Sequence, residues 1–189
     1  TKAMKMVSAA KLRKAQTSLI AARPYAQKVQ EVMDHLLGGE TEYENALITP
    51  RAQVKKVCYV VLGADRGLCG GYNSQLLRLA ESEVNAQKEA CGLLLIGKKA
   101  RDFFRDKPYE IMAHHVNIGD NPGMTQAMAL SSYIMDQYLT GEVDEVHFVY
   151  SEFISTMVQE PKAKQVLPIP ASEQVKSEAS LHDLYIFEP

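Results

Sequence analysis

Residues 1–37 carry an unbroken helical pattern, and this pattern limits the possible folds more than any other feature of the sequence. Apolar or small residues recur there in alternating steps of three and four, which is the heptad spacing of a coiled-coil seam. The seam consists of Leu12, Ala15, Leu19, Ala22, Ala26, Val29, Met33 and Leu36. A helix of this length rises about 1.5 Å per residue and extends about 55 Å, so we expect it to project from the rest of the protein.

Pro24 lies inside this helical pattern. A proline in a helix interior removes a backbone hydrogen bond and disfavours the helix by about 3 kcal/mol or more, so two shorter helices broken near Arg23 are an alternative. The seam keeps its phase through Pro24, which favours one kinked helix that ends at Gly38 and Gly39. An alanine-rich seam buries little apolar area, so this helix alone is only marginally stable. We therefore expect a second helix, from another chain or from outside this sequence, to pack against it.

The charges of the chain are segregated. The formal net charge is −2, yet residues 1–30 hold seven cations and no acid, so the remainder carries −9 (−2 minus +7). The cations are Lys2, Lys5, Lys11, Arg13, Lys14, Arg23 and Lys28. This split predicts an acidic partner for the first helix. A nucleic-acid-binding module is the alternative, although only Tyr25 offers an aromatic ring for stacking in this segment and no known nucleic-acid-binding motif is present.

The rest of the chain, residues 40–189, alternates strand-like and helix-like segments. Such alternation predicts one α/β domain with a mostly parallel sheet, flanking helices and right-handed crossovers. Strands are expected at 54–62, 92–96, 109–117 and 143–150, with a short strand-like piece at 184–187. Helices are expected at 73–90, 98–105 and 121–139, the first capped by Asn73 and the last started by Asn121-Pro122. We therefore expect two domains, a helix over 1–39 and an α/β domain over 40–189.

A glycine-rich segment, DRGLCGG at 65–71, lies between the first strand and the helix after it, where a phosphate-binding loop would lie. It lacks the Lys-Ser/Thr pair of a nucleoside-triphosphate loop, and its glycines are not spaced as Gly-x-Gly-x-x-Gly. We therefore favour a structural turn, or a loop that presents Arg66 and Cys69 to a partner. A small α/β enzyme that uses this loop as its site is the alternative.

The remaining residue types indicate no metal or cofactor. His114 and His115 are adjacent on an expected strand, so their side chains point to opposite faces and do not share a metal. The three cysteines form no Cys-x-x-Cys pair, and Cys58 and Cys91 are expected to be small buried hydrophobic residues. No apolar run approaches the length of about 18–20 residues that a membrane-spanning helix needs.

Several short motifs follow one another along nearly the whole chain. They are TKAMKMVSAAKLRKAQ (1–16), ARPYA (22–26), DRGLCGGYN (65–73), GDNP (119–122), FISTMVQEP (153–161), LPIPAS (167–172) and YIFEP (185–189). Together and in this order they resemble the gamma subunit family of the F-type ATP synthases. One motif alone would be weak, whereas the ordered set is highly specific.

The resemblance implies a non-catalytic central stalk that couples ion flow through a membrane ring to ATP synthesis or hydrolysis by rotation. In that family the N- and C-terminal helices form an antiparallel coiled coil inside a ring of alternating alpha and beta subunits. The catalytic sites are in the beta subunits, so no cofactor is expected here. A Rossmann-like domain forms the foot, beside the epsilon subunit and the c-ring. This implies a peripheral location at the cytoplasmic face of a bacterial plasma membrane.

Compared with the family, this sequence is expected to lack the start of the first helix and the whole C-terminal helix, which would be the mate of the seam. It also lacks the cysteine-bearing insertion that the chloroplast form carries after Pro161, which favours a bacterial origin.

The resemblance also implies roles for individual residues. A shaft segment that faces acidic loops of the beta subunits is matched by Thr1, Lys2, Met4, Lys5 and Met6. Arg66 and Cys69 match a loop at the same level, and Tyr185 and Glu188 match the foot surface that meets the c-ring and epsilon. Ordinary helix solvation is the alternative for Lys2 and Lys5.

Overall fold

The computed structural model describes residues 2–37, 45–119 and 123–170. The chain divides into two compact units, one that contains the first helix and one that spans Glu44–Pro170, and each is described by itself. The predicted domain division into 1–39 and 40–189 stays a prediction. The expected helix start at Asn121-Pro122 and the expected strand at 184–187 lie outside the described residues.

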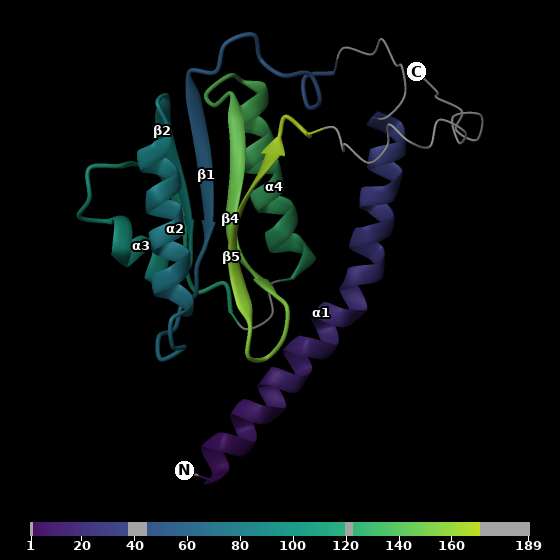
Figure 1. The fold of residues 1–189 in the computed structure, drawn as a ribbon, viewed down its shortest axis with the longest axis vertical. Helices are drawn as coiled ribbons and strands as arrows, with labels where there is room; N and C mark the ends of the chain where they lie inside the picture. The colour runs from purple at the N-terminus through teal and green to yellow at the C-terminus, as the bar shows by residue number, and fades with distance from the viewer. Residues whose placement is uncertain (1, 38–44, 120–122, 171–189) are drawn as a thin grey trace. The chain divides into compact units, whose positions relative to one another are not determined.

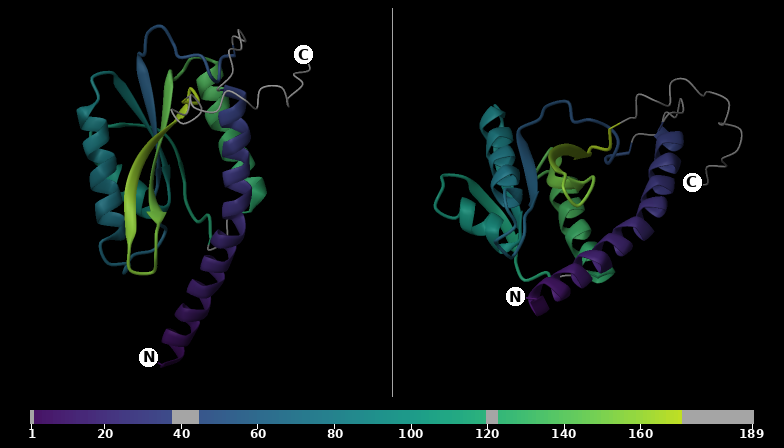
Figure 2. Two further views of the ribbon diagram at one scale, coloured as in Figure 1. Left: turned by 45° about the vertical axis from the view of Figure 1, so that its right-hand side comes forward. Right: turned by 60° about the horizontal axis from the view of Figure 1, so that its bottom comes forward.

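The described residues of the first unit form one helix, α1 (Lys2–Leu37), which continues through Pro24 and curves along its length (Figure 2). The one-helix prediction is therefore correct and the two-helix alternative is wrong. None of the described side chains of α1 is buried. Among the seam residues, Leu12 is 47% exposed, Leu19 38% and Val29 44%. No helix in the described ranges is both long and apolar enough to cross a bilayer.

The second unit is built on a five-stranded sheet in the order β3-β2-β1-β4-β5 (Figure 1). Its strands are β1 (Lys56–Leu62), β2 (Ala90–Ile96), β3 (Glu110–His115), β4 (Glu145–Phe153) and β5 (Gln159–Leu167). The first four are parallel, and β5 pairs antiparallel with β4. The predicted α/β class with a mostly parallel sheet is confirmed. The β5 strand was not predicted, because Pro161 weakens a strand signal, although an edge strand tolerates proline.

Helices cover both faces of this sheet (Figure 2). On one face, α2 (Tyr72–Ala86) and α3 (Lys98–Phe104) pack on the core, and on the other face lies α4 (Met124–Leu139). The central strand β1 is buried on both sides, since Val57, Tyr59 and Val61 belong to the α2 side and Cys58 and Val60 to the α4 side. This two-sided burial explains its continuous apolar sequence.

The cysteine predictions have mixed outcomes. Cys58 is 4% exposed, as predicted, and its burial raises the pKa of its thiol to about 12. Cys91, expected to be buried, is only partly so. It lies at the start of β2, at the edge of the core on the α2 side, where its thiol donates to the carbonyl oxygens of Val84 and Glu89 at 3.9 and 3.5 Å.

The carboxyl ends of β1 and β2 approach each other closely at Gly97. Gly97 has φ +91°, and a Cβ atom on it would lie 2.6 Å from the carbonyl oxygen of Gly63. Its N–H donates to the carbonyl of His115 at 2.7 Å, and the N–H of Gly63 donates to the carbonyl of Ile96 at 2.9 Å. The segments that leave β1, β2 and β3 are therefore held together at one edge of the sheet.

Candidate functional site

The glycine-rich loop, residues 65–71, leaves the carboxyl end of β1 and leads into α2. Strand β1 lies between β2 and β4. The chain proceeds from β1 outward through β2 to β3 and then returns to β4 on the other side of β1. Open α/β sheets bind their ligands at this kind of topological switch point. The loop is therefore placed where this fold class presents its functional groups.

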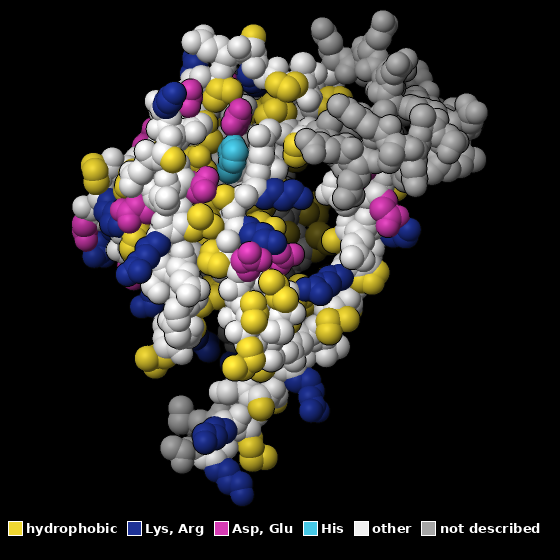
Figure 3. Space-filling view, in the orientation of Figure 1, with side chains coloured by type: hydrophobic (Ala, Val, Ile, Leu, Met, Phe, Trp, Pro, Cys, Tyr) yellow, Lys and Arg dark blue, Asp and Glu magenta, His cyan; other side chains and the backbone are white. Residues whose placement is uncertain are grey.

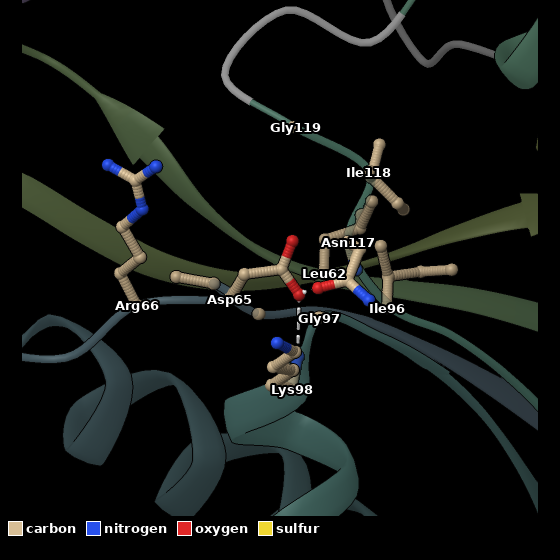
Figure 4. Close-up of a pocket in the computed structure, with 11 residues that line it drawn as sticks. Leu62, Asp65, Arg66, Ile96, Gly97, Lys98, Asn117, Ile118 and Gly119 are labelled. Atoms are coloured by element: carbon tan, nitrogen blue, oxygen red, sulfur yellow. Dashed lines mark hydrogen bonds between the residues drawn. The ribbon is translucent and has the colours of Figure 1, made fainter.

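Asp65 anchors the start of the glycine-rich loop. Its Oδ1 accepts the backbone N–H of Lys98 and the backbone N–H of Asn117, each at 3.0 Å (Figure 4). Hydrogen bonds from the Asn117 and Lys98 backbones hold the pKa of Asp65 below its usual range, against an opposing effect of desolvation. A pocket of about 600 Å³ lies beside it, lined by residues from the ends of β1, β2 and β3. Because Oδ1 accepts two backbone N–H groups and the pKa of the carboxyl is lowered, Asp65 joins three segments and is poorly suited to act as a base.

Asn73 anchors the rest of the loop. The sequence predicts it as a helix cap, and this is wrong, because α2 begins at Tyr72 and Gly71 occupies the cap position. Instead, Oδ1 of Asn73 accepts the N–H of Ala64 at 3.3 Å. Its Nδ2 donates to the carbonyl oxygen of Arg66 at 3.2 Å and to the sulfur of Cys69 at 3.0 Å. Asn73 thus stabilises the loop from inside its curve.

With its ends anchored, the loop presents its middle residues to solvent. Arg66 and Cys69 are exposed, so the structure brings the two predicted loop residues onto one exposed segment. Leu68, which no sequence pattern indicated, is fully exposed at 109% and has φ +59°. The sequence signal that could have identified Leu68 is a leucine inside a short glycine-rich segment, between Gly67 and Cys69, because such a loop offers no core in which to bury it. The arrangement can offer a cation, a thiol and an apolar side chain to a partner.

The predicted shaft residues are described only in part. Lys2, Lys5 and Met6 are exposed on α1, with Met6 at 66%. Figure 3 shows cationic and apolar side chains following one another along this helix. Thr1, Tyr185 and Glu188, and the side chains of Met4 and Leu36, lie outside the described residues.

The described side chains provide no evident metal centre. No group of three or more His, Cys, Asp or Glu side chains that could hold an ion occurs within the described ranges. His114 and His115 are both exposed at the end of β3.

The fold and the loop define a class of protein: a Rossmann-like α/β domain with an anchored, exposed loop at its switch point, in a chain that also carries a long helix with an exposed seam. A family model described as ATP synthase matches residues 1–189. The ATP synthase gamma chains of Desulfitobacterium hafniense and Moorella thermoacetica are 42% and 43% identical over 189 residues. Each match covers 100% of this chain and 65% of the relative.

A solved ATP synthase structure also contains a chain that is similar to this one. The central stalk and c-ring structure of the Tetrahymena thermophila mitochondrial ATP synthase contains a chain that is similar with a TM-score of 0.70 and 27% identity. The match covers 88% of this chain and 71% of that one. This chain belongs to the family of ATP synthase gamma chains. The resemblance drawn from the ordered motifs is confirmed, and the nucleic-acid-binding and small-enzyme alternatives gain no support.

Proposed function

We propose that this chain acts as the central stalk of a rotary ATP synthase and that it contributes no catalytic residue. The observation that carries the proposal is the exposed seam of α1, a helix of 36 residues. Leu12, Leu19 and Val29 keep between 38% and 47% of their surface exposed at heptad spacing. A regular apolar stripe that is left exposed on a long helix is an interaction site for another helix.

The mechanism follows from a stiff and asymmetric shaft. A second helix on the seam would complete a coiled coil that transmits rotation without bending. Each beta subunit around such a shaft meets a different face, and differences in contact energy favour different conformations of each subunit. Lys2 and Lys5, beside Met6, supply cations for acidic loops of the beta subunits. Exposed ion pairs are worth only about 0–1 kcal/mol each, so such contacts can form and break during rotation.

The α/β domain supplies the other contacts in this proposal. Arg66 and Cys69 on the glycine-rich loop face the beta subunits, and Tyr185 and Glu188 belong to the foot that meets epsilon and the c-ring. The chain is then peripheral to the membrane, at the cytoplasmic face of the bacterial plasma membrane, and it couples ion flow through the ring to ATP synthesis or hydrolysis.

Reconstitution with alpha and beta subunits tests this function. We expect the full-length gene product to bind the alpha–beta ring and to change its rate of ATP hydrolysis. Leu12→Asp together with Leu19→Asp should abolish this effect, whereas Ile20→Asp, at an exposed position outside the seam, should preserve it. Saturable binding of ATP by the chain alone in calorimetry would contradict the proposal. Sub-micromolar binding of nucleic acid at physiological salt in gel shifts would favour the nucleic-acid alternative.

A further inference from the structure

The segments that leave β2 and β3 turn to opposite faces of the sheet. The segment after β2 enters α3, whose Ala100 and Phe104 pack on the α2 side, whereas the segment after β3 passes Ile118, which packs on the α4 side. A cavity of about 600 Å³ opens where these segments part, at the carboxyl ends of the strands. Open α/β sheets hold their ligands in crevices of this kind, outside the carboxyl ends of the strands. This crevice is therefore a place where the fold can bind a ligand.

Backbone N–H groups converge on one point in the crevice. The N–H groups of Lys98 and Asn117 both donate to Oδ1 of Asp65 at 3.0 Å (Figure 4). The backbone of Ile118 forms a further hydrogen bond with the same carboxylate. One of these donors follows β2 and the other two follow β3, so the arrangement does not depend on the end of a single helix.

The backbone conformation at the crevice is what brings the donors together. Asn117 has φ +59° and Gly97 has φ +91°. Residues in the left-handed region turn successive N–H groups toward one point, and concave arrangements of this kind bind anions in phosphate sites. The left-handed region is unfavourable for residues with a side chain, although asparagine tolerates it better than most. The hydrogen bonds to Asp65 therefore hold Asn117 in a conformation that it would otherwise adopt rarely.

The charges at the crevice also favour an anion. Among the residues that line the cavity, Arg66 and Lys98 are cations and Asp65 is the acid. Hydrogen bonds from the backbones of Asn117, Lys98 and Ile118, together with the charge of Lys98, hold the pKa of Asp65 below its usual range, although desolvation opposes them. A negative charge is thus stabilised at this point, whichever molecule carries it.

We propose that this crevice is a binding site for a compact oxyanion and that the carboxylate of Asp65 is its resident occupant. Oδ1 of Asp65 takes the place that an oxygen of free phosphate or of a small carboxylate would take. The wild-type chain therefore holds no free anion there. The inference goes beyond the proposed function and does not depend on it, because it needs no other subunit. It also gives a physical reason to expect no ATP binding, since the donors that would hold a phosphate group are already used.

Replacing Asp65 with alanine should open the site to free anions. Asp65→Ala leaves a space the size of a carboxylate, which formate fits, and this space adjoins the cavity, so inorganic phosphate also has room. We expect rising formate or phosphate to restore at least about half of the stability that the variant loses, with a saturating dependence on anion concentration. Chloride at matched ionic strength should restore none. Urea unfolding measures the recovery, and the backbone amide signals of Lys98 and Asn117 in NMR spectra should shift along the same saturation curve.

Controls are needed because phosphate stabilises many proteins by being excluded from their surfaces. Wild type should show only this general effect, which does not saturate. Asp106→Ala should behave in the same way, since the side chain of Asp106 is 80% exposed and does not line the cavity. Asp65→Asn keeps a side-chain oxygen in a group of nearly the same shape, so its amide should fill the site and exclude free anions.

Each outcome of these titrations has a defined meaning. Saturable recovery of Asp65→Ala by at least one of the two oxyanions, together with shifts of the Lys98 and Asn117 amides, supports the site. A response of Asp65→Ala no larger than that of wild type overturns it. Equal saturable recovery in Asp65→Asn, or saturable phosphate binding by wild type, also overturns it, because the anion would then bind elsewhere.

A second measurement covers the case in which Asp65→Ala does not fold in chloride. The variant is then refolded from urea in chloride, formate and phosphate. Folding in an oxyanion but not in chloride supports the site, and no folding in any of the three overturns it. All of these measurements use the chain alone, so their failure leaves the proposed function untouched, and that function is tested separately with the alpha–beta ring.

Discussion

The side-chain Nδ2 of Asn73 lies 3.0 Å from the sulfur of Cys69, so a residue in the first turn of α2 holds the far end of the loop that precedes its own helix. The same nitrogen donates to the carbonyl oxygen of Arg66, at the other end of the curve. One half-buried amide thus fixes how the exposed Leu68 between them is presented to a partner. A surface contact can depend on a residue that never touches the partner.

Replacing Asn73 should therefore loosen the glycine-rich loop. Asn73→Ala removes the hydrogen bonds to Ala64, Arg66 and Cys69, and we expect a loss of about 1–2 kcal/mol in the free energy of unfolding. Amide hydrogen exchange in the loop should become faster, while the strands stay protected. Urea unfolding and exchange measured by mass spectrometry check the two parts. Gln75→Ala, three positions from the start of the same helix, serves as the control and should leave both quantities unchanged. Equal exchange rates in Asn73→Ala and wild type would contradict the role given to this amide.

Asp65 should make the stability of the domain depend on pH in the acid range. Its pKa in the folded protein is lowered by backbone hydrogen bonds from its ordinary value of 3.8. Because the pKa of Asp65 is lower in the folded than in the unfolded state, the ionised carboxylate stabilises the folded protein. This stabilisation is complete above pH 3.8 and is lost as the pH falls through the pKa of the folded state. At neutral pH, Asp65→Ala should destabilise the protein by about 1–2 kcal/mol, a modest figure because the carboxylate is partly exposed.

The same variant should approach wild-type stability as the pH falls below 3.8. Urea unfolding at a series of pH values measures this convergence. Asp106→Ala is the control, since that side chain is 80% exposed, and it should change stability by no more than about 0.5 kcal/mol. A difference between wild type and Asp65→Ala that stays constant down to the lowest pH would show that the carboxylate charge is not the cause.

The sequence predicts the architecture of the sheet well, because strands that are buried on both faces consist almost entirely of apolar residues. Both β1 and β2 are buried on two faces and read as continuous apolar runs, so their positions differ from the prediction by only two residues at the start. The continuity of α1 through Pro24 also follows from the sequence, since the heptad phase does not change there. Patterns that extend over many residues thus predict helices and strands reliably.

The sequence does not predict which hydrogen bonds a single polar side chain makes. Asn73 is a good helix cap by its chemistry, and only the folded chain shows that its amide bonds Ala64, Arg66 and Cys69 instead. The sequence also gives no sign that Met157, in the β4–β5 hairpin, lines one cavity together with Gly71, because 86 residues of sequence separate the two and no periodicity links them. Contacts between distant loops depend on strand order, which is a property of the whole sheet.

Two glycines with similar backbone conformations should respond differently to alanine. Gly97 has φ +91° and Gly141 has φ +81°, so a side chain at either position is strained by about 1–2 kcal/mol. Only at Gly97 would the new Cβ also meet backbone, 2.6 Å from the oxygen of Gly63, whereas nothing lies within 4 Å at Gly141. Gly97→Ala should therefore lose about 1–3 kcal/mol more than Gly141→Ala. Chemical denaturation of both variants measures the difference, and equal losses would show that the close approach of β1 and β2 is not required.

The exposed seam of α1 should make the chain self-associate when no other subunit is present. A lone helix of this length is only marginally stable in water, and pairing of two seams removes apolar surface from solvent. We expect helix content to rise with protein concentration in circular dichroism, together with a dimer or larger species in sedimentation. Leu19→Lys should weaken this association at least about tenfold by placing a charge in the seam.

The adjacent residue Ile20 provides the control for this last prediction. Ile20 is 62% exposed and lies outside the seam, while Leu19 is 38% exposed and belongs to it. Both variants, Leu19→Lys and Ile20→Lys, add the same charge and remove an apolar side chain of similar size, so any difference between them reports the seam and not the net charge. A chain that stays monomeric at all concentrations with α1 fully helical would remove the need for a partner helix, and the shaft interpretation would lose its main support.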